Sequence, residues 1–128
     1  MVAMAQTAYL VDDDASIRTA VRRLLKSAGF SVRVFTSAEE FLQSDFKTEA
    51  GCLILDIRLP GMSGYELLEQ FLASGVHVPT IVVTGHDRQG MEERAMQLGA
   101  ASYLRKPFDE KTLLGAISSA TNFYRVAI

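Results

Sequence analysis

Aspartates end two of the apolar runs in this sequence, and they are the residues whose type and placement could do chemistry. Asp56 follows the apolar run 52–55, and Asp12, Asp13 and Asp14 follow the run 9–11. An apolar run that stops at a carboxylate is typical of a buried parallel strand with an acid at its carboxyl end. In open parallel sheets this end of the strands forms the binding crevice. The sequence therefore predicts one acidic pocket, whose carboxylates repel one another unless a cation or protons offset their charge.

Two further runs end in groups that suit such a pocket. Thr84 closes the β-branched run 80–83, and Lys106 follows the short run 101–105. If the first and third strands are neighbours, three carboxylates, a hydroxyl and an ammonium group meet at one end of the sheet. Carboxylate oxygens favour Mg²⁺ over softer metals. A divalent cation, a carboxylate nucleophile, a hydroxyl and a lysine are the groups needed to transfer a phosphoryl group to Asp56.

Strand and helix patterns alternate five times along the chain, which positions these groups. We expect strands at 8–11, 31–35, 52–56, 80–84 and 101–105. The strand at 31–35 alternates polar and apolar residues and is expected near a sheet edge, whereas 52–56 is apolar throughout and is expected at the centre. Five strand–helix repeats indicate an α/β fold with a parallel sheet covered by helices on both faces.

The helices are predicted from caps and from apolar residues at helical spacing. Asp14 and Asp109 are expected N-caps, and Ser37 with Glu40 and Ser63 with Glu66 have the spacing of capping boxes. Behind the second of these boxes, one helix face is expected to be buried, with the apolar residues Leu67, Leu68, Phe71 and Leu72.

Length and composition limit the class of protein. The chain has 128 residues, of which 48% are hydrophobic, so we expect one domain over 1–128 with a core at about 8–122. The formal net charge of −2 argues against bulk nucleic-acid binding. Cys52 is the only cysteine, so no internal disulfide can form, and packing is expected rather than reactivity. Neither a signal peptide nor a membrane-spanning run is recognisable, which favours a cytoplasmic location.

Four motifs in this order and spacing resemble one known family. They are VDDD at 11–14, LDIRLPGMSG at 55–64, VVTGH at 82–86 and KPFDEKTLL at 106–114. Together they resemble the receiver domain of two-component response regulators, and most of all the FixJ-type branch. The resemblance implies a (βα)5 doubly wound, flavodoxin-like or CheY-like fold with strand order 2-1-3-4-5. It also implies a phosphorylation-controlled signalling switch rather than a conventional enzyme, because such domains catalyse only their own phosphorylation and dephosphorylation.

The resemblance implies a role for each residue that matches the family motifs. Asp56 is expected to accept a phosphoryl group from a histidine kinase. Asp13 and Asp56 are expected to ligate Mg²⁺ (or Mn²⁺) directly, together with the backbone carbonyl of Arg58, and Asp12 to act mostly through water. Lys106 is expected to pair with Asp56 or its phosphate.

The same resemblance implies a switch and a set of flanking residues. Thr84 is expected to move toward the phosphate and Tyr103 to turn inward as Thr84 leaves space. Gly85, His86 and Pro107 are expected to flank the pocket, where Gly85 leaves the acyl phosphate open. The bond between Lys106 and Pro107 is expected to be cis, an isomer that costs little before proline.

Partners follow from the resemblance as well. The kinase is expected to dock near the first helix, where Ile17, Arg18 and Val21 are candidate contacts. The face of the fourth helix and fifth strand is expected to pair two phosphorylated copies or to control an output domain, with Arg88, Arg94 and Arg105 on it. No direct contact of this chain with nucleic acid or membrane is expected.

Other interpretations stay open on the residues alone. An aspartate run before a helix can be a plain N-cap, Lys106 a solvated charge, and His86 an exposed loop residue. A flavin- or nucleotide-binding protein shares this fold but needs a phosphate-holding loop where Asp12–Asp14 would repel phosphate. A metal-dependent phosphatase with an aspartate nucleophile carries an acid where Arg58 stands. A receiver that serves only as a docking module is disfavoured by the complete set of pocket residues.

Overall fold

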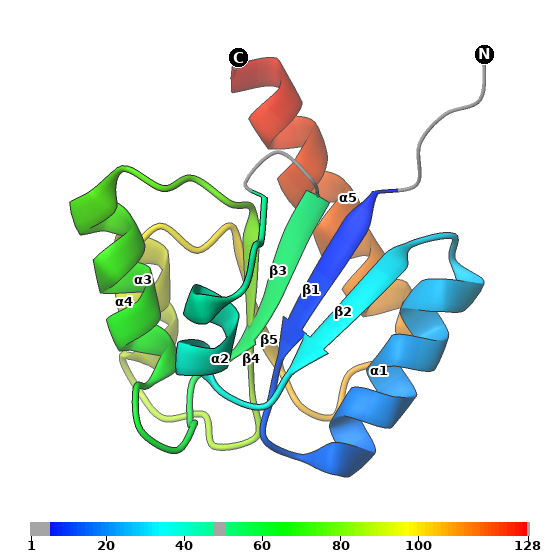
Figure 1. The fold of residues 1–128 in the computed structure, drawn as a ribbon, viewed down its shortest axis with the longest axis horizontal. Coiled ribbons are helices and arrows are strands. Elements are labelled where there is room, and N and C mark those ends of the chain that lie inside the picture. The colour runs from blue at the N-terminus through cyan, green and yellow to red at the C-terminus, as the bar shows by residue number, and fades with distance from the viewer. Residues whose placement is uncertain (1–5, 48–50, 128) are drawn as a thin grey trace.

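A five-stranded parallel sheet forms the centre of the protein (Figure 1). The computed structural model describes residues 6–47 and 51–127. The strands are β1 (Thr7–Val11), β2 (Ser31–Phe35), β3 (Gly51–Asp56), β4 (Thr80–Thr84) and β5 (Ser102–Arg105). They lie in the order β2-β1-β3-β4-β5, so β2 is at an edge and β3 is central. The predicted doubly wound α/β fold and its strand order are confirmed.

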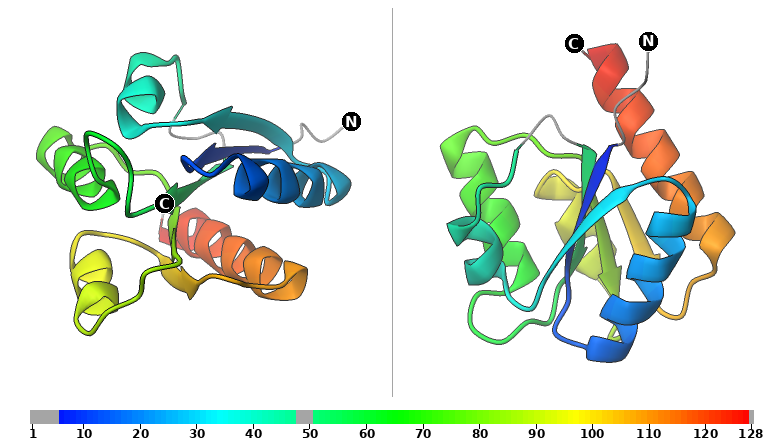
Figure 2. Two further views of the ribbon diagram at one scale, coloured as in Figure 1. Left: turned by 90° about the horizontal axis from the view of Figure 1, so that it is seen from below. Right: turned by 45° about the vertical axis from the view of Figure 1, so that its right-hand side comes forward.

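Five helices cover the two faces of this sheet. They are α1 (Ala15–Ser27), α2 (Ala38–Gln43), α3 (Gly64–Ser74), α4 (Met91–Gln97) and α5 (Glu110–Ala127). Viewed along the sheet, α1 and α5 lie on one face and α2, α3 and α4 on the other (Figure 2). None of the helices among the described residues combines the length and the apolar character that crossing a bilayer requires.

Alternating side chains of the strands supply one core on each face. In β3, Leu53 and Leu55 belong to the cluster under α2 and α3, whereas Cys52 and Ile54 belong to the cluster under α1 and α5. All four side chains are fully buried, as expected for a strand with helices on both sides. Burial raises the pKa of the Cys52 thiol to about 12, so this cysteine is a packing residue, as predicted.

Local hydrogen bonds explain where the helices begin. The Asp14 carboxylate accepts from the backbone N–H groups of Ser16 and Ile17, and Ser63 forms the complete predicted capping box with Glu66. The capping box predicted at Ser37 is only half formed. Ser37 accepts from the backbone N–H of Glu40. The Glu40 carboxylate bonds instead to the Thr36 hydroxyl at 3.2 Å.

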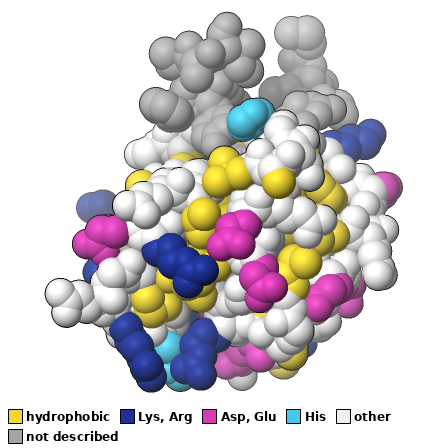
Figure 3. All heavy atoms as spheres, turned by 90° about the vertical axis from the view of Figure 1, so that its left-hand side faces the viewer, with side chains coloured by type: hydrophobic (Ala, Val, Ile, Leu, Met, Phe, Trp, Pro, Cys, Tyr) yellow, Lys and Arg dark blue, Asp and Glu magenta, His cyan; other side chains and the backbone are white. Residues whose placement is uncertain are grey.

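One predicted core residue is wrong. Leu72 was expected to be buried with Phe71, but its side chain is 53% exposed, while that of Phe71 is only 5% exposed. Leu67, Leu68 and Phe71 form the buried face of α3. Each residue of a helix is rotated by about 100° from the one before it, so Leu72 lies outside that face. Figure 3 shows the side of the molecule that α3 and α4 form, where hydrophobic, acidic and basic side chains are interspersed.

Candidate functional site

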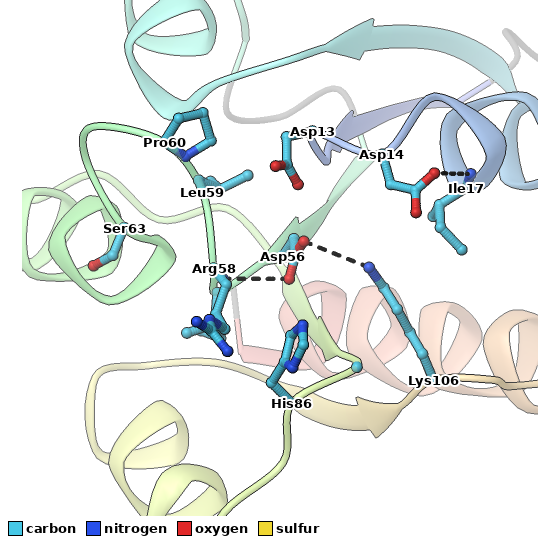
Figure 4. A pocket seen from close by; sticks show the side chains of 12 residues that line it. Asp13, Asp14, Ile17, Asp56, Arg58, Leu59, Pro60, Ser63, His86 and Lys106 are labelled. Atoms are coloured by element: carbon cyan, nitrogen blue, oxygen red, sulfur yellow. Dashed lines mark hydrogen bonds and ion pairs between the residues drawn. The ribbon is translucent and has the colours of Figure 1, made fainter.

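A cleft of about 670 Å³ opens at the carboxyl ends of the strands. Loops after β1, β3, β4 and β5 meet there, which is the binding edge of an open parallel sheet. Figure 4 shows Asp13, Asp56, Arg58, His86 and Lys106 around this cleft. The predicted meeting of the carboxylates with Lys106 is therefore confirmed in space.

Three carboxylates converge in the cleft as the sequence predicted. Asp12, Asp13 and Asp56 each offer an oxygen, and these oxygens all lie within 4.8 Å of one another. Their closeness follows from the register of the sheet, in which Val11 of β1 is paired with Leu55 of β3. Asp12 and Asp56 are buried, and Asp13 is exposed. A buried and an exposed carboxylate beside Asp56 give a hard, anionic oxygen set that fits a divalent cation such as Mg²⁺.

Lys106 supplies the positive charge of the site. Its Nζ atom donates to Oδ2 of Asp12 at 2.7 Å and to Oδ2 of Asp56 at 3.5 Å. Pairing with Asp56 was predicted, but the shorter contact is to Asp12. Asp12 is completely buried and points its second oxygen, Oδ1, at the backbone N–H of Asp14, so a close cation is needed to offset its charge.

The surroundings of Asp56 shift its proton affinity. Burial, and next the neighbouring Asp12 carboxylate, raise the pKa of Asp56 to about 6, against the opposing effects of Lys106 and the Arg58 backbone N–H. Burial alone would lower the pKa of Lys106, but its bonds to Asp12 and Asp56 outweigh that effect and raise it. Lys106 is thus charged at neutral pH and Asp56 is largely ionised.

Thr84 ends β4 directly before Gly85 and His86. It is completely buried, and its Oγ1 accepts from the backbone N–H of His86 at 3.1 Å. Gly85 and the exposed His86 line the cleft. A Cβ atom at Gly85 would meet the Lys106 side chain only at an ordinary 3.8 Å, so in this conformation a small side chain would not crowd the cleft. Pro107 is exposed and follows Lys106 through a cis peptide bond, as predicted.

Tyr103 already points inward in this structure. It is only 7% exposed, and its hydroxyl donates to Oδ1 of Asp87 at 2.6 Å. The other oxygen of Asp87 accepts from Nε of Arg105, whose Nη2 reaches Glu92 of α4 at 2.9 Å. Asp87 was not singled out in the sequence because nothing in its neighbourhood along the chain marks it. Arg88 belongs to the loop before α4, not to the predicted fourth helix.

A second residue that the sequence did not indicate supports the loop after β3. Oε2 of Glu39, on α2, accepts from the backbone N–H of Met62 at 2.9 Å. The loop turns at Gly61, which has a left-handed φ of 74°, close against the Glu39 carboxylate. Oε1 of Glu39 is buried and has no hydrogen-bond partner within residues 6–47 and 51–127. A distant helix therefore holds the loop that also contains Arg58.

The predicted kinase-docking residues on α1 differ in their availability. Ile17 lines the cleft and is half-buried. Arg18 donates from Nη1 to the carbonyl oxygen of Asp12 at 2.9 Å. Val21 is only 5% exposed and packs with Leu25 in the core, so its prediction as a docking contact is wrong.

Known proteins carry the same sequence pattern on the same fold. Residues 8–118 match the family described as the response regulator receiver domain. The chain belongs to this family. As a receiver domain, it is a signalling domain of the two-component type, in which a phosphorylation-controlled switch is the general role. Receiver domains bind Mg²⁺ at an acidic pocket, are phosphorylated by histidine kinases and are linked to output domains.

Several relatives are similar over most of this receiver domain. The chain is 40% identical over 112 residues to "Transcriptional regulatory protein FixJ" of Azorhizobium caulinodans, covering 88% of this chain and 53% of that protein. It is 42% identical over 113 residues to "Nodulation protein W" of Bradyrhizobium diazoefficiens, covering 88% and 50%. The chain thus spans about half the length of these curated relatives. The predicted likeness to FixJ-type receivers is confirmed.

Solved structures agree with the fold. The crystal structure of FixJ-N has a TM-score of 0.83 and 35% identity, with 94% of this chain and 96% of that chain covered. The structure of the response regulator StyR has a TM-score of 0.85 and 44% identity, with 94% and 61% covered. The sheet and its strand order therefore belong to a known structural family.

Proposed function

We propose that Asp56 is the phosphoryl acceptor of this receiver domain and that the chain is a switch controlled by a histidine kinase. The observation that carries the proposal is the position of Asp56 in the cleft. Its carboxylate lies within 4.8 Å of two other carboxylates and 3.5 Å from an ammonium group. It is the one member of this acidic cluster that both lines the cleft and stands opposite Lys106. Asp13 also lines the cleft, but no ion pair joins it to Lys106.

Asp12, Asp13 and Asp56 would hold Mg²⁺ or Mn²⁺, with the backbone carbonyl of Arg58 as a further oxygen ligand. The three carboxylates repel one another, and Lys106 offsets only one of their charges. When bound, the cation would neutralise negative charge on the phosphoryl oxygens. Lys106 would supply a second positive charge to the same oxygens, and the Thr84 hydroxyl a hydrogen bond.

The reaction transfers a phosphoryl group from a histidine of the kinase to Asp56. A carboxylate oxygen of Asp56 attacks the phosphorus of the kinase's phosphohistidine, the phosphorus–nitrogen bond breaks, and the imidazole leaves with the bonding electron pair. The product is an acyl phosphate on Asp56. Hydrolysis later returns the carboxylate and releases inorganic phosphate. The exposed side chains of Arg58 and His86 line the cleft and would flank the attacking water.

The output is a change of surface around α4, β5 and α5. A movement of the Thr84 side chain toward the phosphate would lengthen or break its bond from the His86 N–H. Asp87 follows directly in the chain and holds Tyr103 and Arg105 of β5, so movement of the loop alters that strand's exposed side. This face would bind a second copy or an output domain. Control of transcription in the cytoplasm is the role we propose, since a relative is named as a transcriptional regulator.

The experiment is phosphorylation by a small phosphodonor with matched variants. With acetyl phosphate and Mg²⁺, we expect a mass increase of one phosphoryl group in the wild type and none in Asp56→Asn. Asp13→Asn should still fold but need more than about tenfold higher Mg²⁺, since one charged ligand is lost. Labelling of Asp56→Asn equal to that of the wild type would refute the assignment of the acceptor.

A flavodoxin-like cofactor site and a phosphatase are separated from this proposal by simple readouts. A flavin-binding protein would purify with flavin absorbance. A phosphatase would turn over a phosphomonoester many times, whereas the proposed acceptor stops at one phosphoryl group per chain until hydrolysis.

A further inference from the structure

Helix α1 carries a concentrated positive charge on a surface that the phosphoryl site does not use. It holds four of the 13 Lys and Arg residues of the chain and none of the 15 Asp and Glu residues. Arg18, Arg22 and Lys26 follow one another at four-residue intervals and therefore form one row, with Arg23 beside it. The α3–α4 side, by contrast, mixes both signs of charge (Figure 3).

This charge is not neutralised within the described part of the protein. Among the described residues, Arg22, Arg23 and Lys26 have no carboxylate within 4.0 Å, whereas Arg33, Arg94 and Arg105 all form ion pairs. Like charges four residues apart destabilise a helix by a few tenths of a kcal/mol. Lys26 in the last turn gains from the helix dipole, but that effect fades within one turn and does not extend back to Arg18.

The charged row borders a groove with an apolar wall. The groove has a volume of about 290 Å³ and is lined by Arg18, Thr19, Arg22, Arg23 and Lys26 of α1 and by Val34 of β2. Val34 is half-buried and packs against the core under α1. Ile17, which faces the acidic cleft, does not line this groove. The two sites therefore lie on different sides of the helix.

The strand beside the groove is an edge strand. Among the described residues β2 pairs only with β1. The N–H of Ser31 donates to Gln6 and the carbonyl of Phe35 accepts from Asp12, so the odd-numbered residues of β2 direct their backbone groups toward β1. Because the direction alternates along a strand, the N–H and C=O groups of Val32 and Val34 point away from the sheet. No partner for them lies in the part of the chain that the structure describes, so they are open to hydrogen bonding with a further strand.

We propose that the α1–β2 side binds an extended acidic segment of a partner protein, which adds a strand to the edge of β2 and places its carboxylates over Arg22, Arg23 and Lys26. Alternate side chains of a strand are about 6.6 Å apart. Residues four apart in a helix are about 6 Å apart along its axis. Acidic residues at alternate positions of the added strand therefore match the row of cations. Backbone pairing supplies affinity, and charge supplies selectivity.

Two other occupants fit less well. A second copy of β2 would bring the two α1 rows and the two Arg33 side chains near each other, and like charges disfavour that pairing. A nucleic acid would find cations concentrated on this one helix of a chain whose overall formal net charge is −2. A strand that carries carboxylates would pair with the outward backbone groups of β2 and also neutralise the cations of α1.

The test uses the whole chain and a blocked peptide of about eight residues that alternates valine with glutamate. We expect its amide shifts to centre on Val32, Val34 and the exposed side of α1. Binding should weaken at least tenfold in the double variant Arg22→Glu/Lys26→Glu and should fall steeply as salt is raised from about 0.02 to 0.3 M. A peptide that alternates valine with lysine should not bind.

A matched control has the same charge change on other elements. Arg88 is exposed in the loop before α4 and Lys111 is exposed on α5, so Arg88→Glu/Lys111→Glu should keep the peptide affinity within about twofold of the wild type. Equal loss in both double variants, shifts confined to other elements, or tighter binding of duplex DNA than of the acidic peptide would overturn the proposal. Circular dichroism of each variant verifies the fold, and a variant that unfolds is replaced by Arg22→Gln/Lys26→Gln, for which the same loss is expected.

Discussion

Lys106 lies closer to Asp12 than to Asp56, with Nζ–Oδ2 distances of 2.7 and 3.5 Å. Asp12 is completely buried, so the lysine offsets a charge that water cannot reach. The longer contact leaves one side of Asp56 available to an incoming phosphoryl group. Lys106 therefore pairs with Asp12 in the unphosphorylated site, and a small displacement of its ammonium would bring it to the phosphoryl oxygens on Asp56.

Replacement of Lys106 tests this arrangement. In Lys106→Met the buried Asp12 carboxylate loses its cation, and we expect a loss of about 3 kcal/mol in the free energy of unfolding, measured with urea in EDTA. Without the ammonium, the pKa of Asp56 should rise further above 6, since Lys106 lowers it. The double variant Asp12→Asn/Lys106→Met should recover much of the lost stability. A single variant as stable as the wild type would contradict the pairing.

Neutralisation of Asp56 should make stability less dependent on pH. Asp56 has a pKa of about 6 in the fold and about 4 in the unfolded chain. Between these values the folded state holds a proton that the unfolded state has released, so the free energy of unfolding falls as pH rises. Asparagine avoids that penalty. We expect Asp56→Asn to be about 2 kcal/mol more stable than the wild type at pH 7 without Mg²⁺, and no more stable below about pH 4.

An exposed acid gives the opposite sign and serves as the control for that measurement. Bonding to Thr112, first through its side chain and then its backbone N–H, lowers the pKa of Asp109. Its contribution to stability is present at neutral pH and is lost as pH falls through the lowered pKa. Asp109→Asn should therefore be less stable than the wild type at pH 7. If Asp56→Asn also lost stability at pH 7, the pKa of Asp56 would not be raised.

Asp87 is predicted to set the acidity of Tyr103. Burial first, and then the bond to the Asp87 carboxylate, raise the pKa of Tyr103 above its ordinary value. Asp87→Asn removes the negative charge, so the phenol should ionise at lower pH in an ultraviolet titration. Tyr103→Phe identifies the signal among the four tyrosines. Glu92→Gln leaves the Tyr103–Asp87 bond intact and should leave that titration unchanged.

Glu39 is predicted to position the loop after β3 for cation binding. Glu39 lies on α2, and its carboxylate accepts from the backbone N–H of Met62 in that loop. Glu39→Ala should lower the melting temperature and weaken Mg²⁺ binding. The binding is measured by a Mg²⁺ titration that monitors the amide shifts of the loop. Glu39→Gln retains an acceptor and should restore most of both. As a comparison, Glu40→Ala removes a carboxylate whose single hydrogen bond among the described residues is to Thr36, and it should leave Mg²⁺ affinity unchanged. Equal effects at 39 and 40 would contradict a specific role for Glu39.

Most of the fold was predictable because its signals are local. Apolar runs that end in acids marked β1 and β3, and caps at Asp14 and Ser63 marked helix starts, all of which the structure confirms. Burial was harder to predict for residues at the margin of a helix face. Leu72 lies beside Phe71 in the sequence, yet only the packing of α3 on the sheet decides which of the two is covered.

For the site, the sequence by itself determined which groups end each strand and, through the parallel fold, that they share one crevice. Tertiary structure alone decided that Lys106 pairs first with Asp12, that Asp87 holds Tyr103, and that Glu39 supports a loop 23 residues away. The physical reason is the range of each interaction. Strand ends are set by local hydrophobic pattern and register. Hydrogen bonds between side chains form only when elements far apart in the chain are positioned to within a few tenths of an ångström.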